Sequence, residues 1–124
     1  EERPQKDARC MTLYRRRRIF ELIEDNIAGG ITVARLANEI GLSLGFFTRS
    51  FTAAVGRSPQ QFIIDRRISR ARAQLRDSSL SIGAIAFECG FSSHAHMSFQ
   101  FRKYLSITPS QLRLNRSETA DESR

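Results

Sequence analysis

The chain has 124 residues, enough for one small domain or two very small ones packed together. Its 20 Lys and Arg outnumber 13 Asp and Glu, which gives a net charge of +7, and an apolar share of 40% argues against wholesale disorder. No stretch approaches the roughly 20 apolar residues of a membrane-spanning helix, so we expect no membrane partner.

The two ends of the chain and its cysteines bear on where the protein works. No signal peptide opens the chain, and two cysteines, Cys10 and Cys89, are too few for a disulfide scaffold. We therefore expect a reduced, cytoplasmic protein. The first residue is not Met, so we expect a fragment or a processed chain. Residues 1–11 and 117–124 lack apolar periodicity and are expected to be disordered tails.

Apolar spacing in the first half predicts three helices and no strand. The first ends at the Gly29–Gly30 pair, the second is capped by Thr32 and ends at Gly41, and the third is capped by Ser43. Together they form an expected first subdomain over residues 12–57. The predicted helices cover about residues 12–28, 32–40 and 44–55, with Phe47, Phe51 and Val55 facing inward in the last.

A strong helix start follows. Ser58, Pro59 and Gln61 form an N-cap, a first-turn proline and a capping box, which predict a long linker helix within 58–77. Its inward stripe is expected to be Ile64, Ile68, Ala71 and Leu75.

The second subdomain is expected over 78–116. It contains a helix over about 81–89 closed by Gly90, a helix over about 94–105 capped by Ser92 or Ser93, and a last helix from Pro109 to about Arg116.

The chain carries an internal repeat. LANEIGLS (36–43) matches IAFECGFS (85–92) at an offset of 49, and after one extra residue Phe51 matches Phe101 and Ser58-Pro59 matches Thr108-Pro109. Each copy reads helix, glycine-containing turn, helix, which is a helix-turn-helix. The alternative is a generic bundle whose two hairpins resemble each other by chance. The predicted fold is all-α, homeodomain-like, with about seven helices in two helix-turn-helix subdomains.

The charge lies on the repeat. From Ile31 to Arg116 there are 12 positive charges against four acidic residues, a net +8. A helix-turn-helix holds its second helix out so that it can enter the major groove of DNA. Two such helices on one face of a duplex lie about 34 Å apart, and a linker helix of 18 residues, roughly 27 Å long, is a plausible spacer between them. With Phe47 facing inward, the outward side of the 44–55 helix holds Gly45, Arg49 and Thr52, bordered by Phe46 and Thr48. With Met97 facing inward, the outward side of the 94–105 helix holds Ala95, Phe99 and Arg102, bordered by His96 and Ser98. These residues are the candidates for base reading. Expected phosphate contacts are Ser43, Arg57, Ser92, Ser93, Arg102 and Lys103.

Two of these candidates have open alternatives. Arg49 is the leading candidate to bond a guanine edge, and the alternatives are a phosphate contact or a solvated surface charge. Phe99 can meet a thymine methyl group, or the helix can be rotated so that Phe99 is buried.

The segments GRSPQQFIIDRRISRARAQL and SIGAIAFECGFSSHAHMSFQFRKYLSITPSQLR, with LANEIGLS and FFTRSF before them, resemble the AraC/XylS family of bacterial transcription regulators. The resemblance covers about Arg16 to Arg113. It implies seven helices, sequence-specific binding to promoter DNA, activation through RNA polymerase, and in many members a separate effector-sensing or oligomerising domain, usually ahead of this one. By position it places DNA reading on Gly45, Thr48 and Arg49, and on His94, Ala95, His96 and Phe99.

This chain departs from the family pattern at two positions. Phe99 stands where the family usually has Arg, and Ser106 where it usually has Gly. The first departure leads us to expect that the first subdomain carries more of the specificity.

Other functions are less well supported. His94 and His96 do not converge on a metal, because helix residues two apart point about 200° apart, and Cys89 belongs to no Cys-x-x-Cys pair. No catalytic set or cofactor motif is present, so we expect no metal, no cofactor and no enzyme. Two further alternatives stay open: a non-specific nucleic-acid binder, and a helical protein-interaction module.

Overall fold

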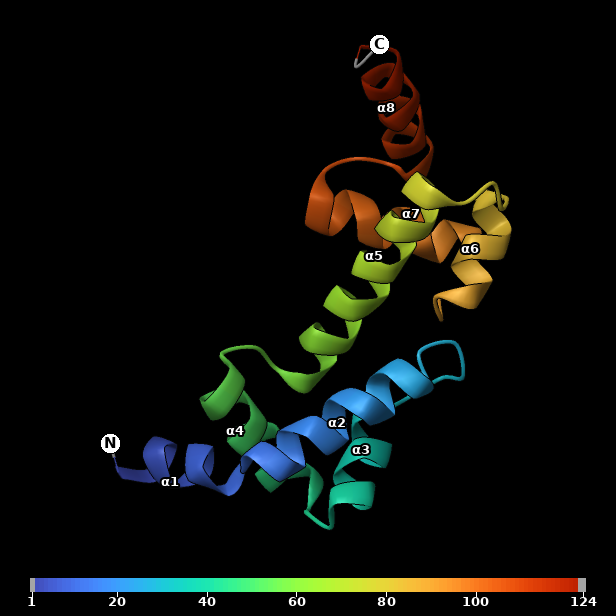
Figure 1. Cartoon of the computed structure of the whole chain (residues 1–124). Helices are drawn as coiled ribbons and strands as arrows, with labels where there is room; N and C mark the ends of the chain where they lie inside the picture. Colours follow the sequence, from blue (N-terminus) through green and yellow to red (C-terminus); the bar gives the residue numbers. More distant parts are fainter. Residues whose placement is uncertain (1, 123–124) are drawn as a thin grey trace. The chain divides into compact units, whose positions relative to one another are not determined.

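The computed structural model describes residues 2–122, and side chains for residues 6–115. Eight α-helices follow one another in this part of the chain, and it contains no strand (Figure 1). The prediction of an all-α fold is confirmed. The helices are α1 (Glu2–Cys10), α2 (Leu13–Asp25), α3 (Val33–Ile40), α4 (Leu44–Val55), α5 (Pro59–Asp77), α6 (Ile82–Glu88), α7 (His94–Leu105) and α8 (Pro109–Glu122).

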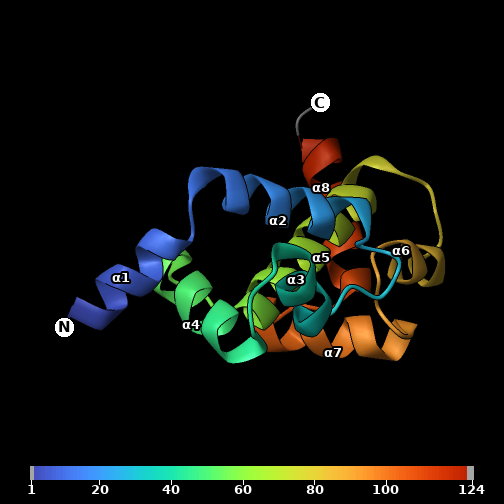
Figure 2. The same cartoon turned by 90° about the horizontal axis from the view of Figure 1, so that it is seen from below.

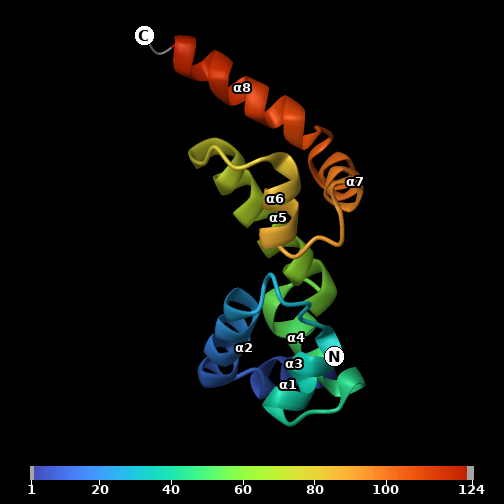
Figure 3. The same cartoon turned by 90° about the vertical axis from the view of Figure 1, so that its right-hand side faces the viewer.

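The chain divides into two compact units, and the division falls inside α5. The first unit runs to Asp65 and holds α1–α4 with the start of α5. In both Figure 1 and Figure 2, α1 lies beside α4. The second unit runs from Arg66, and Figure 3 shows its α6 and α7 beside the later part of α5, while the end of α8 extends away from them. Each unit contains one helix-turn-helix.

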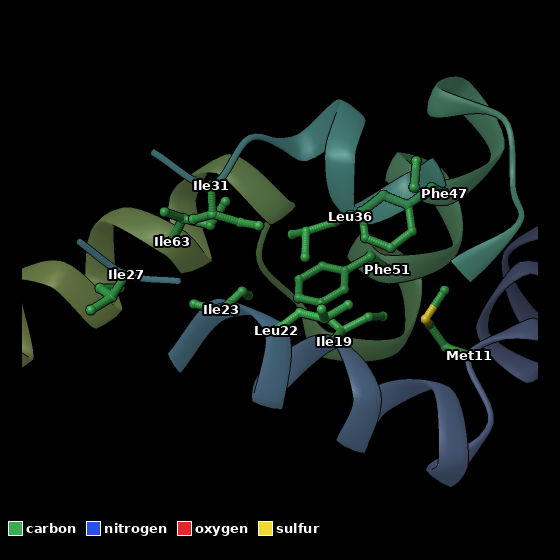
Figure 4. Packing of buried hydrophobic residues seen from close by; sticks show 11 residues of the cluster. Met11, Ile19, Leu22, Ile23, Ile27, Ile31, Leu36, Phe47, Phe51 and Ile63 are labelled. Atoms are coloured by element: carbon green, nitrogen blue, oxygen red, sulfur yellow. The ribbon is translucent and has the colours of Figure 1, made fainter. Parts of the chain in front are cut away.

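The first unit has its own hydrophobic core (Figure 4). Phe47 and Phe51 of α4 are fully buried, as predicted, and their rings lie 5.8 Å apart. The α5 stripe begins one residue earlier than predicted, because Ile63 is buried and Ile64 only half-buried. The remaining core residues come from α2, α3 and the connecting turns: Met11, Ile19, Leu22, Ile23, Ile27, Ile31, Leu36 and Ala37.

The expected N-terminal tail is a helix instead. α1 packs against α4, and both Asp7, at 8% exposure, and Met11, at 4%, are buried. Arg15 of α2 donates to the Cys10 carbonyl oxygen at 2.7 Å and so fixes the end of α1. A polar sequence can form a stable helix when a few of its side chains bury against a neighbour, which periodicity alone does not reveal.

The second unit is built around the later part of α5. Ile68, Ala71 and Leu75 are buried as predicted, and Met97 and Phe101 of α7 are fully buried. Ile85, Ala86 and Cys89 complete this core from α6 and the turn after it.

The last helix is longer than predicted. The backbone of α8 continues past Arg116 to Glu122, so the expected tail over 117–124 is helical as far as it is described, and residues 123–124 lie outside the described part. Arg113 anchors the start of α8, because its guanidinium donates to the carbonyl oxygens of Leu75, Ser78 and Leu80, at 3.4, 3.1 and 2.6 Å.

Local hydrogen bonds set the helix ends. The hydroxyls of Thr32, Ser43 and Ser58 accept from the backbone N–H three residues later, as predicted. Of the two candidates for the cap of α7, the structure selects Ser93, which accepts from the His96 N–H at 3.0 Å. α7 ends at Ser106 in the left-handed conformation, with φ of 58°.

Candidate nucleic-acid interface

α4 has one anchored face and one free face. Phe47, Ser50 and Phe51 are buried against the rest of the first unit. Gly45, Arg49 and Thr52 are exposed, so their predicted outward orientation is confirmed. Leu44, a position that the sequence pattern did not indicate, is also exposed at the start of the helix. Capping by Ser43 and the left-handed Gly41 before it fix where α4 begins, so these side chains project from a rigid element.

Two hydroxyls on α4 are already engaged by its own backbone. Thr48 donates to the Leu44 carbonyl oxygen at 2.8 Å, and Thr52 donates to the Thr48 carbonyl oxygen at 2.7 Å. In this arrangement each threonine offers a partner only its methyl group and the remaining lone pairs of its oxygen.

Arg49 is held from two sides. Its Nε lies 3.8 Å from the Asp7 carboxylate of α1, and its guanidinium carbon lies 5.7 Å from the centroid of the Phe46 ring. The Arg49 side chain is nevertheless 49% exposed. An acidic residue far away in sequence therefore lies beside the residue best suited to bond a guanine edge, and no sequence signal indicates this pairing.

Gly45 leaves an opening in the first turn of α4. A Cβ built there meets only Arg49 Nη1, at an ordinary 3.7 Å, and Gly45 has no left-handed backbone that would require glycine. Glycine at a helical position costs about 0.5–1 kcal/mol relative to alanine. The packing of the described residues does not require glycine at this position, and the missing side chain leaves the backbone of α4 open to close approach by another molecule.

α7 repeats this division between an anchored and a free face. Met97 and Phe101 are fully buried, while His94, Ala95 and Phe99 are exposed. Phe99 is 57% exposed, so the rotated helix that would bury it is wrong.

His96 belongs to the local structure of α7. Its Nδ1 accepts from the Ser92 backbone N–H at 3.2 Å, its ring meets the edge of Phe91, and its Nε2 lies 3.4 Å from the Gln100 amide. Because both ring nitrogens have neighbours within the unit, His96 is less available to a base than its position predicted.

The phosphate candidates fall into two groups. Ser92, Arg102 and Lys103 are exposed, and Lys103 Nζ lies 5.4 Å from the centroid of the Tyr104 ring. Ser43 and Ser93 are caps, and Arg57 is held by two hydrogen bonds of 2.9 Å to Asp65.

Several basic residues are hydrogen-bonded within the fold or partly buried in it. In the run Arg15–Arg18 near the start of α2, Arg15 donates to the Cys10 carbonyl oxygen and Arg16 donates to the Ala54 carbonyl oxygen at 2.6 Å. Burial lowers the pKa of Arg67 below its usual range.

Cys89 is fully buried in the second core, and burial raises the pKa of its thiol to about 11.

The described part of the chain lacks two kinds of feature. None of its helices is long and apolar enough to cross a membrane. No three His, Cys, Asp or Glu side chains described there come together as a metal site.

Comparisons with known proteins agree with this architecture. A family model described as "Helix-turn-helix domain" matches residues 36–115. A transcriptional regulator with an AraC-type DNA-binding domain from Chromobacterium violaceum superposes with a TM-score of 0.72 and 34% identity, over 79% of this chain and 88% of that one. The chain belongs to the AraC family.

Two further AraC-like relatives bear on its function. VirF of Yersinia enterocolitica, named a virulence regulon transcriptional activator, is 35% identical over 102 residues, which are 82% of this chain and 38% of VirF. The chain therefore corresponds to well under half of that relative. The DNA-binding domain of AdpA, solved in complex with a target DNA, superposes with a TM-score of 0.76 and 26% identity, over 79% of this chain and 88% of that one.

Proposed function

We propose that this AraC-family chain binds double-stranded promoter DNA sequence-specifically and regulates bacterial transcription. The observation that carries the proposal is the exposed face of α4, where Gly45, Arg49 and Thr52 stand opposite the buried Phe47 and Phe51. A helix anchored in this way can enter the major groove with short side chains and one arginine toward the bases. The similarity to the DNA-binding domain of AdpA, solved in complex with a target DNA, supports DNA as the partner.

Each candidate residue has a distinct role in this proposal. Arg49 bonds a guanine edge, Gly45 allows the backbone to come close, and the methyl groups of Thr48 and Thr52 contact bases. In the second unit His94, Ala95 and Phe99 face the groove, with His96 supporting the turn. Contacts to phosphates are assigned to Ser92, Arg102 and Lys103, and in second place to Ser43, Ser93 and Arg57, which the fold already engages.

Both units are proposed to bind one duplex, one helix per major-groove segment. α5 is continuous over 19 residues, roughly 28 Å at 1.5 Å per residue. Protection of about two turns of DNA from cleavage supports engagement of both units, and protection of one turn contradicts it.

The wider role follows from the relatives. Because VirF is named an activator, we propose that this protein activates transcription through RNA polymerase, in the cytoplasm and without enzymatic activity of its own. A separate effector-sensing or dimerisation domain in the same protein is part of this proposal.

The test is selection of duplexes from a random pool, followed by gel shifts on the selected and a scrambled sequence over a series of salt concentrations. The proposal predicts tighter binding to the selected duplex and affinity that falls steeply with salt. Arg49→Ala should reduce discrimination at one base pair by about 1–3 kcal/mol. The charge-matched control is Arg17→Ala, at an exposed position of α2. It should lower the affinity for the selected and the scrambled duplex by the same factor, or leave both affinities unchanged.

The two alternatives give different results. Equal affinity for every sequence would indicate a non-specific nucleic-acid binder. No binding even at low salt would indicate a protein-interaction module.

A further inference from the structure

α7 exposes an aromatic ring at the centre of its free face. Phe99 is 57% exposed, whereas Phe101, two residues later on the same helix, is fully buried. Ala95 lies one turn before Phe99 and is also exposed, so the two side chains share one face. Around Ala95 and Phe99 this face is therefore apolar, whereas Arg49 gives the equivalent position of α4 a positive charge.

We propose that Phe99, together with Ala95, makes the second unit a reader of thymine through its 5-methyl group. This inference rests on the proposed function and names the base that this part of the site selects. In the major groove the four bases offer hydrogen-bond donors and acceptors, and thymine alone adds a methyl group. A phenyl ring and an alanine methyl can neither donate nor accept a hydrogen bond, so only thymine gives them a favourable contact.

The same chemistry works against the other bases. A phenyl ring placed over a guanine or cytosine edge removes water from polar groups and returns no hydrogen bond, which is unfavourable. The neighbouring polar side chain does not compensate, because the ring of His96 already accepts the Ser92 N–H. Arg102, one turn after Phe99, and Lys103 lie at the end of α7, where they suit the phosphates that flank the contacted base.

The experiment uses the chain of 124 residues and a duplex obtained by selection from a random pool. Each thymine of that duplex is replaced in turn by deoxyuridine, which removes the 5-methyl group and leaves base pairing unchanged. Removing a methyl group that Phe99 contacts should weaken binding about fourfold, the effect expected for one buried methyl-sized group. This measurement on the unaltered protein needs no variant to fold.

Variants then assign the effect to a residue. Phe99→Ala should bind the thymine and deoxyuridine duplexes equally well. Phe99→Arg should change the preferred base at that position from thymine to guanine. The matched control is Phe87→Ala, which removes an aromatic ring exposed to 79% on α6 and should leave the deoxyuridine effect in place.

The outcomes separate this inference from the proposed function. If the protein prefers one sequence but no deoxyuridine substitution matters, or Phe99→Ala remains as sensitive as the unaltered chain, thymine reading by Phe99 is wrong and DNA regulation stands. If selection yields no preferred sequence, both are wrong. Unchanged DNA binding by Phe99→Ala, with loss of binding to a protein partner, would assign this face to protein contact instead.

Discussion

Asp7 lies beside the arginine that we expect to read DNA, and we predict that it restrains that arginine. DNA binding through Arg49 has to compete with the carboxylate 3.8 Å away, and the carboxylate also repels phosphates. Ion pairs with substantial exposure are worth about 0.2–1 kcal/mol, and Asp7 is largely buried, so we take the upper part of this range. Asp7→Asn should therefore lower the Kd for DNA about two- to fivefold.

The assay is a fluorescence-anisotropy titration at several salt concentrations. A freed Arg49 that reaches a phosphate should also steepen the slope of log K against log salt by about 0.9. The matched control is Asp25→Asn, which removes an exposed acidic group at the end of α2 and should change Kd little. Thermal unfolding of both variants checks that α1 remains in place. Weaker binding or lost base preference in Asp7→Asn would refute the reasoning, because Asp7 would then be positioning Arg49 instead.

Three other predictions concern stability and reactivity. Ser106 has a left-handed backbone, which is strained for a residue other than glycine, so Ser106→Gly should raise the free energy of unfolding by about 1 kcal/mol in denaturant titrations. A decrease in that free energy would show that the Ser106 backbone is not strained. Arg113→Ala removes three charge-assisted hydrogen bonds to carbonyl oxygens and should lower the free energy of unfolding by about 2–4 kcal/mol. A decrease of less than about 0.5 kcal/mol would contradict the anchoring role of Arg113 at the start of α8. With a disulfide reagent at pH 8, Cys10 should react first and Cys89 only on unfolding, because burial raises the Cys89 pKa to about 11; equal rates would disagree with its burial.

Features that depend on neighbouring residues were predictable from the sequence. A serine or threonine hydroxyl caps a helix by reaching three residues along the same chain, so Thr32, Ser43 and Ser58 could be recognised without a tertiary structure. The faces of α4 and α7 followed from one inward-facing apolar residue in each, Phe47 and Met97, and a step of 100° per residue. The exposure of Phe99 needed the structure, because two rotations of α7 fitted the pattern equally well, and so did the choice of Ser93 over Ser92 as its cap.

Features that depend on partners distant in sequence could not be predicted. α1 contains a charged sequence with no apolar stripe, and it is held by Asp7 and Met11 against α4. The selection of Ile63 over Ile64 for the core depends on the angle at which α5 meets the first unit. Sequence periodicity places a helix face to within about one residue and does not resolve that choice.

The arginines show that a count of positive charges overestimates the number of contacts to DNA phosphates. There are 12 positive charges between Ile31 and Arg116. If all of them contacted phosphates, the slope of log K against log salt would be about −11. The structure engages some of them internally: Arg57 and Arg76 bond carboxylates, and Arg113 bonds three carbonyl oxygens. We therefore expect a measured slope clearly shallower than about −11. A slope as steep as that would mean that DNA draws these arginines away from their partners, and Arg57→Ala would then weaken binding as strongly as Arg102→Ala.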